Sequence, residues 1–167
     1  MERNTLDLKW TKRFLGLANF ISGWSKDGST KVGAVIAKEK RLVSLGFNGF
    51  PENTNDSMDI YEDRERKYLR VLHAEANAIL FSKVDLRDCQ LYATHFPCCQ
   101  CAALIIQSGI SEVYVPIQPK EFMDRWYEQI KESLAMFTEA NVLPFMFDME
   151  NNTYTRFKAY NSAIEDY

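Results

Sequence analysis

Two short segments constrain this chain more than any other feature: His73-Ala74-Glu75 and Pro97-Cys98-Cys99-Gln100-Cys101. Imidazole nitrogen and thiolate sulfur are zinc ligands, and a catalytic zinc site holds three protein ligands with water as the fourth. Cys98 and Cys101 stand three positions apart where a predicted strand gives way to a helix. Both thiolates can therefore reach one ion, and the helix N-terminus stabilises their charge. With His73 as the third ligand, the fold must bring the two segments together.

Glu75 lies two positions after His73. In the middle of a regular α-helix the two side chains would diverge by about 200° around the axis. If a helix instead begins near His73, with its N-terminus buried under a sheet, both side chains can border one cavity. A carboxylate beside the metal can take a proton from bound water and deliver it to a leaving amine. We therefore favour a catalytic zinc over a structural one, which would not explain the carboxylate.

The chain offers few other ligands, because it has only four cysteines and two histidines. In a reducing compartment, clustered cysteines favour metal binding or thiol chemistry over a disulfide framework. Cys99 is only two positions from Cys101, a poorer spacing for chelation, so it is not expected to be a ligand. His95 lies in a predicted strand beside the cluster and is a candidate for lining the substrate site. Cys89 opens that strand, where a small buried apolar side chain is expected.

The spacing of apolar residues alternates between helical and strand periods along the chain. A loop rich in Gly, Pro, Asn and Asp spans 48–63, and the segment 64–83 is one helix or two helices broken near His73. The tail from Thr155 is a candidate for a last helix. This order predicts a single α/β domain over 1–167, in which a hairpin and parallel crossovers form a mixed five-stranded sheet. Helices are expected over 6–21, 64–83, 98–108 and 121–140, and strands over 32–37, 41–47, 90–96, 112–117 and 142–148.

Composition and charge exclude several other classes of protein. The 167 residues suffice for one domain of ordinary size. Twenty Lys and Arg against 23 Asp and Glu give a net charge of −3, so there is no overall electrostatic reason to bind nucleic acid. No apolar run approaches the roughly 18–20 residues that cross a bilayer, and Met1-Glu2-Arg3-Asn4 does not begin a signal peptide. We expect a cytoplasmic protein that binds neither membranes nor nucleic acid.

With these motifs the sequence resembles the cytidine and deoxycytidylate deaminase superfamily, and more closely its deoxycytidylate (dCMP) deaminases. The His73-Ala74-Glu75 and Pro97-Cys98-Cys99-Gln100-Cys101 motifs carry the resemblance to the superfamily. The resemblance covers roughly residues 6–117 and implies a three-layer α/β/α cytidine-deaminase-like fold. Phe47 stands where the family usually has Tyr, and the segment after Gln118 is less typical. Narrower pointers to the dCMP deaminases are the segments 25–27, 30–34, 46–51 and 73–81.

The resemblance implies a zinc-dependent hydrolysis that converts dCMP to dUMP and ammonia and supplies dUMP for dTMP synthesis. Zinc would be held by His73, Cys98 and Cys101 and would lower the pKa of its water. Glu75 would accept that proton, protonate the ring nitrogen of the base and then pass the proton to departing ammonia.

The resemblance also implies several substrate contacts. Asn48 would hydrogen-bond the sugar hydroxyl, and Ala74 would line the substrate site. Ser25, Lys26 and Lys31, from a polar loop before the first strand, would bind the 5′-phosphate. The alternatives are that Asn48 belongs to a plain Asn-Gly turn and that the lysines are solvated surface residues.

The dCMP deaminases as a family are activated by dCTP and inhibited by dTTP, each presented with a divalent ion such as Mg²⁺. Gly49 and Phe50, together with Arg64 and Lys67 in the charged run 63–67, are the candidates for such an allosteric nucleotide site. The alternative is a flexible loop followed by the solvated first turn of a helix. Family members are commonly hexamers, so a homohexamer is expected, and Phe122 and Trp126 in the late helix would be interface or core residues.

Other functions remain open at the level of the sequence. Within the superfamily, the alternatives are a tRNA adenosine deaminase, a free cytidine or cytosine deaminase and a riboflavin-pathway deaminase. A tRNA enzyme should show a basic face, and here Lys and Arg are scattered. A free-nucleoside enzyme would not need the polar loop from Ser25 to Lys31. Outside the enzymes, the alternative is a catalytically dead zinc-binding partner protein.

Overall fold

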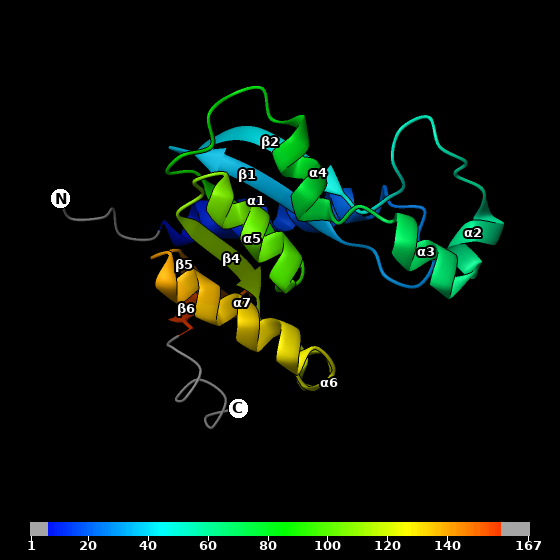
Figure 1. Cartoon of the computed structure of the whole chain (residues 1–167). Coiled ribbons are helices and arrows are strands. Elements are labelled where there is room, and N and C mark those ends of the chain that lie inside the picture. Colours follow the sequence, from blue (N-terminus) through cyan, green and yellow to red (C-terminus); the bar gives the residue numbers. More distant parts are fainter. Residues whose placement is uncertain (1–6, 158–167) are drawn as a thin grey trace.

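The structure is a computed structural model that describes residues 7–157 (Figure 1). Over these residues the chain forms seven helices and one six-stranded sheet. The helices are α1 Leu8–Ser22, α2 Met58–Glu62, α3 Arg64–Arg70, α4 Ala74–Phe81, α5 Cys99–Gln107, α6 Lys120–Arg125 and α7 Tyr127–Glu139. The strands are β1 Gly33–Lys38, β2 Arg41–Phe47, β3 Gln90–Ala93, β4 Glu112–Pro116, β5 Leu143–Asp148 and β6 Thr153–Arg156. Among the described helices, none is long and apolar enough to cross a membrane.

The sheet has the strand order β2-β1-β3-β4-β5-β6. β1 pairs antiparallel with β2 and with β3, and β3, β4 and β5 run parallel to one another. A hairpin followed by parallel crossovers was predicted, and this mixed α/β arrangement is confirmed.

The prediction of five strands was wrong, because β6 adds a sixth strand antiparallel to β5. Between them the Asp148 carboxylate accepts hydrogen bonds from the backbone N–H groups of Glu150 and Asn151, and Asn152 adopts a positive φ of 54°. These are features of a tight turn, so the chain reverses instead of starting a helix. The candidate helix from Thr155 therefore does not form at 155–156, and the rest of that tail, 158–167, lies outside the described residues.

Helices cover both faces of the sheet and make three layers (Figure 1). One face is covered by α1, whose apolar side chains pack on alternate residues of β1, β3, β4 and β5. The other face carries α4, α5 and α7, which contribute to the larger of the two apolar clusters. The residues that α1 contributes to the smaller cluster, on its own face of the sheet, are Phe14, Leu15, Ala18 and Ile21.

The predicted helical segment 64–83 is two helices, one of the two possibilities that the sequence left open. α3 ends at Arg70, and Leu72 then exchanges two backbone hydrogen bonds with Gly49, of 2.8 and 3.1 Å. This extended link leaves His73 as the residue immediately before α4. The predicted loop 48–63 also contains the short helix α2, and the predicted helix 121–140 is interrupted at Trp126, between α6 and α7.

Gly46 of β2 allows α4 to approach the sheet closely. A Cβ atom at this position would lie 2.4 Å from the carbonyl oxygen of Ala74 and 2.4 Å from the backbone nitrogen of Ala78. Real side chains do not tolerate such distances, so glycine is required here. The first turn of α4 is consequently buried against the sheet, with His73 at its end.

Candidate active site

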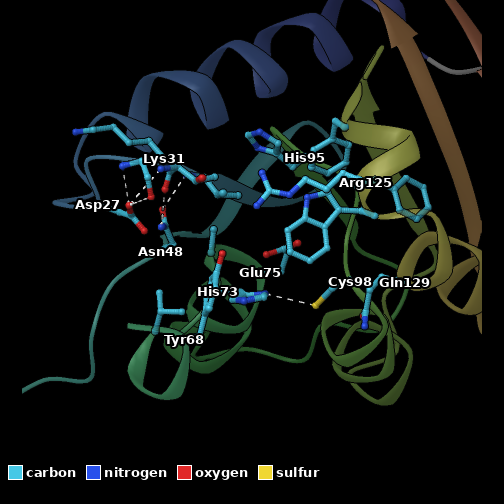
Figure 2. A pocket seen from close by; sticks show the side chains of 18 of the residues that line it. Asp27, Lys31, Asn48, Tyr68, His73, Glu75, His95, Cys98, Arg125 and Gln129 are labelled. Carbon is cyan, nitrogen blue, oxygen red and sulfur yellow. Dashed lines mark hydrogen bonds between the residues drawn. The ribbon is translucent and has the colours of Figure 1, made fainter. Parts of the chain in front are cut away.

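Three side chains that can bind a metal converge where two helices begin. Figure 2 shows two of them, His73 and Cys98. His73 immediately precedes α4, Cys98 immediately precedes α5, and Cys101 lies in the first turn of α5. The Nδ1 atom of His73 lies 3.4 Å from the Sγ atom of Cys98 and 3.4 Å from that of Cys101. The ligand atoms of the three residues all lie within 4.8 Å of one another. The two segments singled out in the sequence therefore meet in space.

The donor set of this cluster fits a zinc ion. Cys98 and Cys101 hydrogen-bond to each other, which lowers the pKa of Cys98 and raises the pKa of Cys101. One proton is thus kept between the two sulfurs, because two thiolates this close repel each other. A divalent cation bound by both sulfurs removes that conflict. One imidazole and two thiolates also leave a fourth tetrahedral position for water, the arrangement of a catalytic zinc site.

Glu75 lies beside the cluster. It is in the first turn of α4 and is only 4% exposed. Burial raises the pKa of its carboxyl above the ordinary value, and nearby His73 partly opposes this effect. Figure 2 shows the Glu75 carboxyl directed into the cavity from beside His73. A carboxyl in such a position can accept and release a proton during a reaction. The hypothesis that a helix begins near His73 and lets both side chains border one cavity is confirmed.

His73, Cys98 and Glu75 line a cavity of about 560 Å³, within the usual range for a small-molecule site, and Cys101 lies behind them in the first turn of α5. One wall comes from the segment before β1, from the residue after β2 and from the C-terminal part of α3 with the residue that follows it. The opposite wall comes from α6 and α7 (Figure 2). The residues of the first wall are Asp27, Ser29, Thr30, Lys31, Val32, Asn48, Lys67, Tyr68 and Val71. The residues of the second wall are Glu121, Phe122, Arg125, Trp126, Gln129 and Ile130.

A buried ion pair belongs to the first wall. The Lys67 ammonium lies 3.2 Å from the Asp27 carboxylate and donates a 2.6 Å hydrogen bond to the Ser29 hydroxyl. The side chains of Lys67 and Asp27 are 8% and 5% exposed. Lys67, predicted as part of an allosteric nucleotide site, therefore lies in the same cavity as His73.

The residues predicted to bind phosphate occupy different places. Lys31 lines the cavity, and its ammonium donates a 2.6 Å hydrogen bond to the carbonyl oxygen of Ser25. Lys26 forms an ion pair with Asp56 at the surface, and neither Lys26 nor Ser25 is among the residues that line the cavity. Ser25 is buried and donates a 2.8 Å hydrogen bond from its hydroxyl to the carbonyl oxygen of Asn48.

Asn48 and Ala74 both line the cavity. The Asn48 side-chain oxygen accepts a 2.8 Å hydrogen bond from the Val32 N–H, and its Nδ2 donates a 2.9 Å bond to the Thr30 carbonyl. Asn48 thus ties the polar loop to the end of β2. Ala74 is fully buried at the start of α4. Their contacts with substrate stay predictions.

The other allosteric candidates lie elsewhere in the molecule. Gly49 and Phe50 line a second cavity, of about 690 Å³, which is bordered by β2 and α4. The Phe50 ring stacks on that of Tyr61, with their centroids 4.0 Å apart. Arg64 lines neither of the two cavities, and its guanidinium lies over the ring of Tyr68, 5.3 Å from the centroid. The role of these residues in binding an effector stays a prediction.

The structure agrees with the predictions for Cys89, Cys99 and His95. Cys89 is fully buried in the core. Cys99 is outside the three-ligand group, and its thiol donates a 2.8 Å hydrogen bond to the side-chain oxygen of Gln129. His95 lines the cavity, with its ring 5.3 Å from that of Phe122.

Sequence reasoning missed the contribution of the α6–α7 wall. Phe122 and Trp126 were considered only as interface or core residues, but both line the cavity. Ser133 donates a 3.0 Å hydrogen bond to the Pro97 carbonyl, and the Gln129 side chain accepts one of 3.3 Å from the Cys99 N–H. The only signal in the sequence was the four-residue spacing of Gln129 and Ser133, which puts both on one helical face.

A family model described as the cytidine and deoxycytidylate deaminase zinc-binding region matches residues 8–117. The chain belongs to the cytidine and deoxycytidylate deaminase family. This result confirms the predicted family and the predicted enzyme class, a zinc-binding deaminase. The matched segment contains the three-residue cluster and Glu75 but ends before α6, so the α6–α7 wall lies outside it.

Among the relatives of this family member is the "uncharacterized deaminase in luxG 3′ region" of Aliivibrio fischeri, 56% identical over 134 residues, which span 80% of this chain and 90% of the relative. The deoxycytidylate deaminase of Homo sapiens is 32% identical over 157 residues, or 90% of this chain and 80% of the human protein. Among solved structures, a dCMP deaminase from the cyanophage S-TIM5 in complex with dCMP and dUMP has a TM-score of 0.64 at 22% identity, covering 87% of this chain and 100% of that chain. The last comparison supports the fold.

Proposed function

We propose that this family member hydrolyses dCMP to dUMP and ammonia. The observation that carries the proposal is the buried Glu75 carboxyl beside the group of His73, Cys98 and Cys101, at a cavity of about 560 Å³. A relative named deoxycytidylate deaminase that shares 32% identity over 90% of the chain supports the choice of substrate.

The residues divide the chemistry between them. His73, Cys98 and Cys101 would hold zinc, which would supply acidity to a bound water and so make a nucleophile available at neutral pH. Glu75 accepts the proton released there and transfers it to the ring nitrogen, so that the neighbouring amine-bearing carbon becomes more electrophilic. The oxygen of the water bonds to that carbon. Glu75 takes the remaining proton from this oxygen and passes it to the amine, and the carbon–nitrogen bond breaks to release ammonia. The burial of Glu75 keeps bulk water from competing for that proton.

The first wall of the cavity is proposed to orient the sugar and phosphate. Asn48 donates one amide hydrogen to the Thr30 carbonyl, which leaves its second amide hydrogen for the sugar hydroxyl. Ala74 packs against the substrate at the start of α4. Lys31 borders the phosphate, and Ser25 and Lys26 belong to the loop that carries it.

The family resemblance extends the proposal to regulation, assembly and location. Activation by dCTP and inhibition by dTTP, each with Mg²⁺, would involve Gly49 and Phe50 in the second cavity, together with Arg64 and Lys67. The hydrogen-bonded pair of Gly49 and Leu72 supports a coupling route, because Leu72 directly precedes His73. A homohexamer in the cytoplasm is proposed on the same resemblance.

A substrate comparison tests the proposal. Zinc-loaded protein is incubated in parallel with dCMP, cytidine, cytosine and an adenosine-containing RNA, and ammonia release is measured. The proposal predicts the highest kcat/KM for dCMP. Preference for another substrate would contradict the substrate assignment, and release from none of them would favour a catalytically inactive zinc-binding protein.

A further inference from the structure

The α6–α7 wall directs an arginine into the cavity (Figure 2). Arg125 is the last residue of α6, and Trp126 separates α6 from α7 with φ −105° and ψ 16°. The helix is interrupted there, and both side chains line the cavity. The Arg125 guanidinium lies over the Trp126 ring, 5.5 Å from its centroid, a contact that supports the guanidinium from one side.

The positively charged side chains that line the cavity differ in how far other groups of the protein compensate their charge. Besides Arg125, the Lys and Arg side chains among the described lining residues are Lys31 and Lys67. Lys67 is neutralised by Asp27, and Lys31 is held by the Ser25 carbonyl oxygen at 2.6 Å. Both lysines therefore have part of their hydrogen-bonding capacity engaged inside the protein.

Arg125 differs from both lysines. Within residues 7–157 its guanidinium makes no hydrogen bond or ion pair, and its contact is the face of Trp126. The neighbouring Asp124 does not compensate it, because that carboxylate pairs with Lys120 at 3.2 Å. A planar guanidinium with all its donors free is suited to bind a phosphate through two parallel hydrogen bonds.

We infer that Arg125 binds the phosphate monoester of the substrate and sets the preference for a nucleotide over a nucleoside. The inference rests on the proposed function, in which the neutral base occupies the end of the cavity near Glu75. The phosphate is then the substrate group that needs a cation, and Arg125 is the lining cation with every donor available. A specificity residue thus comes from α6, outside the segment that defines the family.

Binding and turnover of matched ligands test this inference. Wild-type protein and the variants Arg125→Gln, Arg125→Lys, Lys31→Gln and Arg41→Gln are compared with zinc bound. Isothermal titration calorimetry gives Kd for dUMP and for deoxyuridine, and ammonia release gives kcat/KM for dCMP and for deoxycytidine. Arg41→Gln is the matched control, since Arg41 is an exposed arginine at the start of β2 that does not line the cavity.

Arg125→Gln should weaken dUMP binding by roughly 10–100-fold and lower kcat/KM for dCMP by a similar factor, since a charge-assisted bidentate contact is lost. Deoxyuridine binding and deoxycytidine turnover should not change. Arg125→Lys should restore part of the loss, and Arg41→Gln should behave as wild type. An unchanged Kd for dUMP in Arg125→Gln, equal losses for nucleotide and nucleoside, or a larger phosphate-specific loss in Lys31→Gln would overturn the inference. Failure of the wild-type protein to deaminate dCMP would instead refute the proposed function.

Discussion

The Ser133 hydroxyl shares its one hydrogen between the carbonyl oxygens of Pro97, at 3.0 Å, and Gln129, at 2.8 Å, and Ser133 has no solvent exposure. Pro97 directly precedes Cys98, so α7 supports the turn that carries one of the three candidate zinc ligands. Gln129, one turn earlier on α7, accepts a hydrogen bond from the neighbouring Cys99 N–H. A segment outside the family match therefore stabilises the central part of the family's motif.

Ser133→Ala removes the donor and leaves the Pro97 carbonyl without it in a buried position. We expect a loss of about 1–3 kcal/mol in the free energy of unfolding, together with faster release of zinc to a chelator. Urea denaturation and chelator kinetics measure the two effects. Ser108→Ala is the control, because its hydroxyl bonds only to the Ile105 carbonyl at the end of α5. Wild-type zinc release in Ser133→Ala would contradict a positioning role.

The ion pair of Asp27 and Lys67 gives a prediction for pH dependence. Burial raises the pKa of the Asp27 carboxyl, but hydrogen bonds from Ser29, Thr30 and Lys67 outweigh burial and hold the pKa below the ordinary value of 3.8. Because the folded-state pKa is lowered, the ionised carboxylate stabilises the fold above pH 3.8, and this contribution disappears as pH falls through the folded-state pKa.

Asp27→Asn should therefore lower the free energy of unfolding most near neutral pH. The difference in the free energy of unfolding between wild type and Asp27→Asn should become smaller below about pH 4. Urea denaturation across this range measures it, with Asp124→Asn, from an exposed ion pair, as the control. A gap that is independent of pH would show that the charge of Asp27 does not cause the effect.

The cysteine cluster predicts unequal effects of substitution. Cys101→Ser should lose most bound zinc and its turnover, because a neutral hydroxyl replaces a thiolate ligand. Cys99→Ser should keep a full equivalent of zinc, since Cys99 bonds to Gln129 and lies outside the ligand group. Metal analysis of the purified variants by mass spectrometry measures both. Zinc loss in Cys99→Ser, or a full equivalent in Cys101→Ser, would contradict the ligand assignment.

The pairing of Cys98 and Cys101 as candidate metal ligands could be predicted from the sequence because their spacing is local. Cys98 and Cys101 lie within one turn at the start of a helix. This relation depends on the local sequence and not on contacts with distant segments. The relation between His73 and Glu75 needed one further condition, a helix that begins at His73. The backbone bonds between Leu72 and Gly49 meet that condition, and they are long-range contacts that no local pattern specifies.

The parts that could not be predicted depend on contacts between distant segments. Strand β6 forms because the turn near Asp148 brings the chain back alongside β5. The local sequence of the tail does not specify this pairing, so a helix was an equally acceptable prediction there. The sequence also does not show that Arg125 and Trp126 line the same cavity as His73 and Cys98, or that the helix is interrupted at Trp126. From the sequence alone, Lys67 could equally be a solvated charge at the start of a helix. The structure shows instead that it is buried and paired with Asp27.

The most direct test of the proposed mechanism is dCMP turnover by zinc-loaded Glu75→Gln. Glutamine keeps the size of the side chain but cannot carry the proton, and the three candidate zinc ligands are unchanged. We predict that the variant binds one equivalent of zinc, unfolds near the wild-type temperature and loses roughly 10²–10⁴-fold in kcat for conversion of dCMP to dUMP and ammonia. Turnover of dCMP by Glu75→Gln at the wild-type rate would contradict the role of Glu75 and the mechanism built on it.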